Sequence, residues 1–156
     1  MAKAKRKFKR DVCSLDQAKK FQALGIEIKG IYCYCDHGSK TFIHRTETAS
    51  TLYGLWERKF GDKNRVLIYP TYTLQELSYI IKLVPFLEER FFLYCSEQFN
   101  RGKFSTVVFS AVAVGEFILK EYNIGSMSIH DIRNSLEEGI LDLEAFDDVM
   151  DKRHSS

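Results

Sequence analysis

Residues 31–45 read IYCYCDHGSKTFIHR, and this stretch predicts the β component of the fold. Ile31, Cys33 and Cys35 alternate with tyrosines, so one face of an extended strand carries the thiols and the other face carries the phenol rings. A loop around Gly38 separates this run from a second one, residues 41–45, which is typical of a β-hairpin. We therefore expect an antiparallel hairpin whose thiol-bearing face is buried.

The same stretch holds side chains that a metal ion can use as ligands. Structural zinc sites take four nitrogen or sulfur ligands and usually present a C-x-x-C pair. Here the spacing is C-x-C, and the two other cysteines of the chain lie in different predicted elements. We therefore predict no metal, and the candidate ligands that this interpretation sets aside are Cys33, Cys35, His37 and His44.

Helix and strand signals continue on both sides of the hairpin. The capping-box sequence SLDQ opens a predicted helix over 14–24, which Gly25 ends. An amphipathic pattern predicts a second helix over 47–60, and RVLIYP, residues 65–70, predicts a short strand.

The order of elements then repeats. TLQE at Thr73 opens a predicted helix over 73–84, followed by ERFFLYCSEQF (89–99) and FSTVVFS (104–110) as two strands and a helix over 111–122. The chain thus reads as two helix–hairpin–helix units, residues 14–61 and 73–124, consistent with a tandem repeat. We expect an α+β fold in which both hairpins share one antiparallel or mixed sheet, with the helices mainly on one face.

The two ends of the chain differ from this body in charge. Residues 1–10 carry six bases and no acid, whereas residues 126–156 carry eight acids and three bases. We divide the chain into a basic flexible tail (1–12), a single α+β domain (13–125) and an acidic C-terminal segment (126–156). In that segment a cap at Ser128 and Asp131, and a break at Gly139, predict two short helices.

The composition sets limits on the protein class. A chain of 156 residues with 45% hydrophobic and 28% charged residues is long enough for one compact domain. The longest apolar run, 107–119, is interrupted by Ser110, Gly115 and Glu116, so we expect no membrane span. The basic N-terminus lacks the apolar stretch of a secretory signal, and four cysteines suit a reducing compartment. We expect a cytoplasmic location, or a virion if a phage encodes the chain.

The basic tail predicts affinity for a polyanion. Clustered lysine and arginine side chains neutralise phosphates with little sequence preference, and they also bind acidic protein surfaces. The candidate nucleic-acid contacts are Lys3, Lys5, Arg6, Lys7, Lys9 and Arg10, with Arg101 and Lys103 as additional ones.

No catalytic motif is present. The chain has no G-x-S-x-G, no H-E-x-x-H, no phosphate-cradling glycine loop and no dinucleotide fingerprint. A nucleophilic cysteine needs an open, electropositive setting with a base close by, which Cys35 near His37 or His44 could provide, but such adjacency along a strand is common by chance. We therefore expect no enzymatic activity and no cofactor.

Three pieces of the chain carry a resemblance: CSLDQAKKFQALGI (13–26), GIYCYCD (30–36) and YPTYTLQELSYII (69–81). They resemble a group of small uncharacterised α+β proteins from gut anaerobic bacteria, their phages and mobile elements, over roughly residues 13–80. The resemblance implies a binding or accessory role and no specific chemistry. Together with the charge pattern, it favours a non-enzymatic protein-interaction module with a protein partner, the alternative being a nucleic-acid-associated protein. The oligomeric state is left open.

Overall fold

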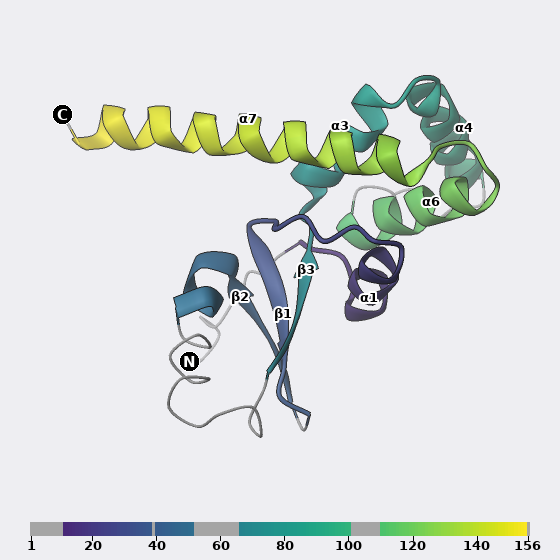
Figure 1. Cartoon of the computed structure of the whole chain (residues 1–156). Coiled ribbons are helices and arrows are strands. Elements are labelled where there is room, and N and C mark those ends of the chain that lie inside the picture. The colour runs from purple at the N-terminus through teal and green to yellow at the C-terminus, as the bar shows by residue number, and fades with distance from the viewer. Residues whose placement is uncertain (1–10, 39, 52–65, 101–109, 156) are drawn as a thin grey trace, which may run out of the picture.

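The structure, a computed structural model, describes residues 11–38, 40–51, 66–100 and 110–155, with the backbone alone over 146–155. It has an α+β fold, as predicted, in which a three-stranded antiparallel sheet of order β2-β1-β3 lies beside a group of packed helices (Figure 1). The strands are β1 (Tyr32–Asp36), β2 (Thr41–Arg45) and β3 (Leu67–Thr71). The helices are α1 (Leu15–Ala23), α3 (Leu74–Leu83), α4 (Leu87–Asn100), α6 (Ala111–Asn123) and α7 (Ile129–Ser155).

The predicted hairpin is confirmed by the antiparallel pairing of β1 with β2. Cys33 and Cys35 are buried on one face of β1, while the tyrosines that alternate with them are half-buried on the other. Gly38 turns the chain with a φ of +91°, a left-handed conformation that glycine adopts without strain. The amide of His37 closes the turn by donating to the carbonyl of Lys40 at 2.9 Å.

The predicted short strand after residue 65 is also confirmed, as β3, which pairs antiparallel with the other side of β1. Pro70 has no amide hydrogen to donate, and its position on an edge strand is where a sheet tolerates it. Of the helix predicted over 47–60, the structure describes residues 46–51, which are helical.

Two capping boxes fix helix starts as predicted. At α1, the amide of Gln17 donates to Ser14 Oγ and the amide of Ser14 donates to Gln17 Oε1. At α3, Thr73 and Glu76 make the same reciprocal pair, at 3.1 and 2.8 Å. Gly25 follows α1 with a φ of +92°, as expected for a glycine that ends a helix.

The sequence prediction was wrong for residues 89–99, which belong to helix α4 and not to a strand. Leu87, Phe91 and Tyr94 recur at helical spacing and face inward, and the rings of Phe91 and Tyr94 lie 5.2 and 5.3 Å from that of Phe117 on α6. The run contains many aromatic residues, which favour strands, so its helical periodicity was not recognised from the sequence. The second predicted hairpin is therefore not formed as expected; its other strand, 104–110, lies outside the described residues except for Ser110, which caps α6.

The prediction of two short C-terminal helices was also wrong, because residues 129–155 form the single helix α7. A Cβ atom on Gly139 would lie 2.5 Å from Cγ of Tyr79 on α3. Gly139 therefore allows α7 to lie close to α3, and it does not end the helix. The predicted cap is confirmed, since the amides of Ser128 and Asp131 each donate to the other's side chain at 3.0 and 3.1 Å.

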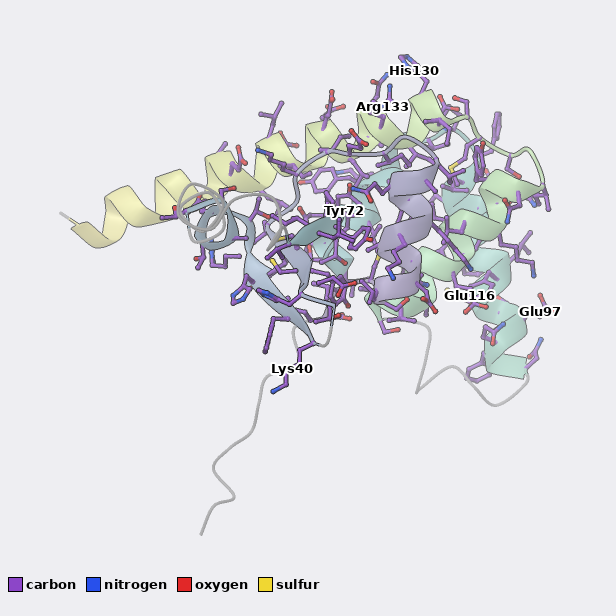
Figure 2. The ribbon with its side chains drawn as sticks, turned by 60° about the horizontal axis from the view of Figure 1, so that its bottom comes forward. Lys40, Tyr72, Glu97, Glu116, His130 and Arg133 are labelled. Atoms are coloured by element: carbon purple, nitrogen blue, oxygen red, sulfur yellow. The ribbon has the colours of Figure 1, made fainter. Side chains whose placement is uncertain are left out.

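The main core lies where most of the helices meet the end of the sheet at which β3 leads into α3, and not on one face of the sheet as predicted (Figure 1). Tyr72 is fully buried near the centre of the molecule (Figure 2). Its ring packs edge-on against Phe21 at 5.8 Å, and its hydroxyl donates to the carbonyl of Ile28 at 2.8 Å. Burial raises the pKa of the Tyr72 phenol, which keeps it neutral.

The folded body begins closer to the N-terminus of the chain than predicted. Val12, placed in the tail by the sequence, is buried and forms a bridge with Thr73. Cys13 is fully buried beside it, and Asp11 Oδ1 accepts a hydrogen bond from the amide of Ala111, the first residue of α6, at 2.8 Å. The described chain is therefore anchored at residues 11–13.

Candidate functional site

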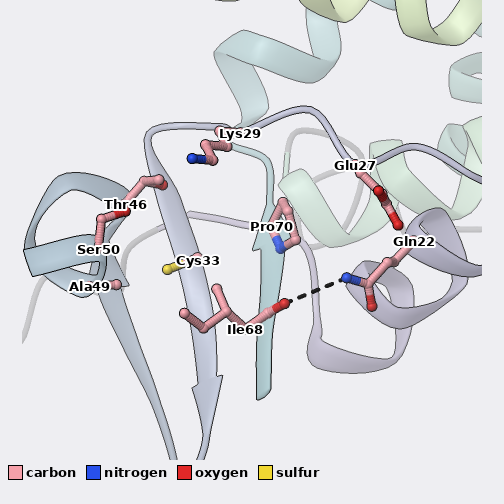
Figure 3. Close-up of a pocket in the computed structure, with 9 residues that line it drawn as sticks. All are labelled: Gln22, Glu27, Lys29, Cys33, Thr46, Ala49, Ser50, Ile68 and Pro70. Atoms are coloured by element: carbon pink, nitrogen blue, oxygen red, sulfur yellow. Dashed lines mark hydrogen bonds between the residues drawn. The ribbon is translucent and has the colours of Figure 1, made fainter. Parts of the chain in front are cut away.

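A cavity of about 340 Å³ opens beside the thiol-bearing face of the sheet (Figure 3). It is bounded by β1, β3, helix α1, the segment 26–30 and the helical residues 46–51. The residues that line it are Gln22, Glu27, Lys29, Cys33, Thr46, Ala49, Ser50, Ile68 and Pro70. Small-molecule sites span roughly 300–1,000 Å³, so this cavity has the size of a site for a small ligand.

The floor of the cavity is apolar because of the strand register. Cys33 pairs with Pro70 and Cys35 with Ile68, so all four side chains project from one face of the sheet. Ala49 packs on the two thiols and is buried with them. The expectation that the thiol-bearing face of the hairpin is buried is confirmed.

The rim of the cavity is charged at two places. Glu27 and Lys29 are exposed, and neither has an ion-pair partner among the residues that the structure describes. Figure 3 shows the carboxylate of Glu27 directed toward Gln22 and the ammonium of Lys29 directed toward Thr46. The two charges thus lie at opposite ends of the opening.

The segment that carries these charges is held in place from the core side. Glu76 is fully buried, and its Oε2 accepts a hydrogen bond from the amide of Ile31 at 3.1 Å. A Cβ atom on Gly30 would lie 2.6 Å from the carbonyl oxygen of Thr71 and 3.1 Å from Glu76 Oε2, so the chain passes here only as glycine. With the Tyr72–Ile28 hydrogen bond, these contacts fix the backbone on both sides of Lys29.

The structure brings two of the four candidate metal ligands together. The sulfurs of Cys33 and Cys35 are 3.8 Å apart. His44 lies opposite Cys33 in the β1–β2 register, whereas His37 is exposed in the turn, with its ring 5.6 Å from that of Phe42. No group of three or more potential ligands is close enough to hold a metal ion among the described residues.

The thiols are poor nucleophiles in this setting. Burial raises the pKa of Cys33 and raises that of Cys13 to about 12, so both stay protonated near neutral pH. All four cysteines are free, and Cys95 on α4 is the one that is partly exposed. The arrangement favours packing over covalent chemistry.

Alkylation of the native protein is expected to modify Cys95 first, at least about tenfold faster than Cys13, Cys33 or Cys35, because access limits the buried thiols. Iodoacetamide treatment at pH 8, timed quenching and peptide mass spectrometry measure the four rates. In denaturant the four rates should converge. Modification of Cys33 as fast as Cys95 in the native protein would contradict the packing described above.

A second feature is an apolar surface on the outer side of α4, defined here as the α4 surface: Phe86, Phe92, Leu93 and Phe99. Their exposed fractions are 78, 70, 66 and 65%, respectively. Phe92 and Phe99 are seven residues apart and are aligned along the helix axis, whereas Leu93 lies about 100° around the axis from Phe92. Phe86 directly precedes the helix. The sequence prediction missed this surface because it placed Phe92, Leu93 and Phe99 in a strand. A helical pattern would have placed these apolar residues on the outer side.

The eight basic residues predicted to contact nucleic acid lie outside the described residues. The structure therefore places none of Lys3, Lys5, Arg6, Lys7, Lys9, Arg10, Arg101 and Lys103. The rim residues of the cavity were not predicted either, because they come from segments far apart in the chain. No local spacing in the sequence relates Gln22, Lys29 and Ser50.

Comparisons of the chain with protein-family models, with curated proteins and with solved structures find no match. Within the part of the chain that the structure describes, none of the helices combines the length and the apolar content that a membrane crossing needs. Function is therefore argued from the cavity and the α4 surface.

Proposed function

We propose that the chain is a protein-interaction module that binds an amphipathic helix with basic flanks on the α4 surface. The supporting observation is the exposure of four large apolar side chains on and next to one helix. Scattered exposed apolar residues are ordinary, but several large ones on and next to a single helix are typical of an interaction site. Aromatic residues are the side chains most enriched at the centres of such sites.

Phe86 supports this proposal through its backbone. It adopts a φ of +65°, a left-handed conformation that costs a residue with a side chain about 1–2 kcal/mol. The ring is 78% exposed, so burial within the described chain does not compensate for this cost. Strained residues of this kind cluster at functional sites.

The charges around the α4 surface indicate the chemistry of the partner. Glu88 and Glu89 are exposed in the first turn of α4, and Glu116 is exposed on the neighbouring helix α6 (Figure 2). The only base within α4 is Arg90, whose Nε donates to Glu121 at 2.8 Å. An apolar surface with acidic neighbours complements a helix whose apolar side is flanked by lysine or arginine.

The underside of α4 supports a rigid binding surface. The rings of Phe91 and Tyr94 stack at 6.2 Å, and both contact Phe117. Arg90 on α4 donates to the carboxylate of Glu121 on α6, which also accepts from Ser126 Oγ just after α6, so a polar contact joins the two helices as well. A preformed surface loses less entropy when it binds.

Photo-crosslinking tests the proposal. A photoreactive residue at position 92, in cells that naturally produce the protein, should capture a partner that a residue at exposed Lys40 does not. The purified partner should then bind the Phe92→Ser/Leu93→Ser variant at least about tenfold more weakly than wild type, because central apolar contacts are lost. Equal capture at both positions, or equal affinity of the variant, would contradict the proposal.

A matched variant separates binding from stability. Phe86→Gly relieves the positive φ and removes an exposed ring, so it should change the free energy of unfolding by less than about 1 kcal/mol while weakening partner binding. If Phe86 had a purely structural role, the substitution would change the free energy of unfolding by more than this and leave partner binding unchanged.

The nucleic-acid alternative is tested separately. If the basic tail binds phosphates, retention on generic DNA or RNA should fall steeply between low and moderate salt and disappear on deletion of residues 1–10. Partner binding on the α4 surface should not depend on that deletion.

A further inference from the structure

We propose that the cavity of Figure 3 binds a short peptide of two or three residues with free termini and a small apolar side chain. The inference goes beyond the proposed function and concerns a different surface. It rests on three properties of the cavity lining: hydrogen-bond acceptors at one end, donors at the other and an apolar floor between them.

The acceptor end is formed by Glu27 and Gln22. The Nε2 of Gln22 donates to the carbonyl of Ile68 at 3.5 Å, which directs its amide oxygen away from that contact. Figure 3 shows the Glu27 carboxylate and the Gln22 side chain at the same end of the cavity. The Glu27 carboxylate is the charged acceptor that complements the α-ammonium group of a peptide, with the Gln22 side chain beside it.

The donor end is formed by Lys29 and Ser50. The hydroxyl of Thr46 already donates to the carbonyl of Gly30, so Thr46 has no further proton to offer. The Lys29 ammonium, which Figure 3 shows on the Thr46 side, and the Ser50 hydroxyl remain as donors there. Together they complement the α-carboxylate of a peptide.

The spacing of the charges sets the length of the ligand. Glu27 and Lys29 are two residues apart, which allows their Cα atoms a separation of up to about 7 Å, and their side chains diverge (Figure 3). In a free amino acid both charged groups are attached to one carbon. An extended dipeptide separates its two charged groups by up to about 7 Å, farther than a free amino acid does, and a volume of about 340 Å³ limits the ligand to a few residues.

The floor sets the character of the ligand. Cys33, Ile68 and Pro70 offer an apolar surface to a side chain placed between the two ends. A single lysine with a carboxylate on the same rim does not suit a phosphorylated ligand, whose several negative charges Glu27 would repel. A zwitterion with an apolar middle matches all three parts of the lining.

Isothermal titration calorimetry of the full chain with the dipeptide Ala-Leu tests this inference. Ala-Leu should bind, and its N-acetylated and C-amidated forms should each bind at least about tenfold more weakly, because each lacks one charge-assisted contact. Lys29→Met should weaken the binding of Ala-Leu by a similar factor without further weakening the binding of the C-amidated form. Glu27→Gln should weaken the binding of Ala-Leu by a similar factor without further weakening the binding of the N-acetylated form.

The matched controls are Lys40→Met, at the exposed hairpin turn (Figure 2), and Glu137→Gln, exposed on α7; both should bind Ala-Leu like wild type. Absence of binding at millimolar Ala-Leu would overturn the inference. So would equal affinity for the blocked dipeptides, tighter binding of free leucine, or equal losses in the control variants. Unchanged thermal unfolding of the Lys29 and Glu27 variants, whose side chains are exposed, shows that a loss of binding is not a loss of folding. Because the α4 surface is unaltered in these variants, either proposal can fail without the other.

Discussion

Replacing Glu76 with alanine is expected to lower the free energy of unfolding by about 3 kcal/mol, since two amides lose their acceptor at about 1–3 kcal/mol each. Glu76 is fully buried; its Oε1 accepts from the amide of Thr73 at 2.8 Å and its Oε2 from that of Ile31 at 3.1 Å. The relief of carboxylate desolvation offsets part of the loss. One side chain therefore supports both the start of α3 and the segment that carries Glu27 and Lys29.

Urea unfolding of wild type, Glu76→Ala and Gln75→Ala measures this effect. Gln75 is the exposed neighbour of Glu76 on α3, so its replacement should change the free energy of unfolding by no more than about 0.5 kcal/mol. Equal stabilities of the two alanine variants would show that the hydrogen bonds of Glu76 are unimportant.

Burial of Glu76 also predicts how the stability of the protein changes with pH. Burial raises the pKa of the Glu76 carboxyl above its ordinary value of 4.5, against the lowering effect of its hydrogen bonds, and the carboxylate of Glu144 raises it further. The folded state then holds this proton at pH values where the unfolded chain has released it, so stability falls as the pH rises from 4.5 through the raised pKa. The stability of wild type relative to Glu76→Gln should therefore be greatest at the acidic end of this range and decrease above it. The opposite trend would contradict the raised pKa.

Gly139→Ala is expected to destabilise the protein by about 2 kcal/mol, although alanine favours a helix interior by about 1 kcal/mol over glycine. The new Cβ would lie 2.5 Å from Cγ, 2.7 Å from Cδ2 and 2.8 Å from Cβ of Tyr79. These atoms include the base of the Tyr79 side chain, which cannot move away without a shift of α3 relative to α7. The contact is thus part of the packing that holds α7 on the body.

A double variant checks the cause. In a Tyr79→Ala background the contacts with Cγ and Cδ2 are absent and only the 2.8 Å contact with Cβ remains. Gly139→Ala should therefore cost less there than in wild type, a non-additivity expected for residues in contact. Stabilisation by Gly139→Ala in the wild-type background would show that α7 does not pack as closely on α3 as described.

The prediction of the fold from sequence succeeded where the interactions are local. Ser14 with Gln17, Thr73 with Glu76, and Ser128 with Asp131 are pairs three residues apart, and all three form the predicted helix starts. It failed in α4, where the apolar residues of the inner and outer sides merge into one aromatic-rich run. The helical period of that run becomes visible only when the inner residues are seen to contact Phe117.

The candidate sites could not be predicted in the same way. The cavity takes Gln22 from α1, Lys29 from the segment before β1 and Ser50 from the helical residues after β2, and only the packed chain brings them together. The α4 surface depends on a helix that the sequence pattern did not indicate. Both sites arise from contacts between distant segments.

By itself the sequence determined the β1–β2 hairpin and the starts of α1, α3 and α7, because alternation and capping act over two to four residues of the backbone. Tertiary structure alone decided that α4 is a helix with exposed phenylalanines and that α7 continues through Gly139. It also decided that Glu76 is buried against the amide of Ile31. In each case the deciding term is packing against a residue distant in sequence, Phe117, Tyr79 or Ile31, which local patterns do not encode.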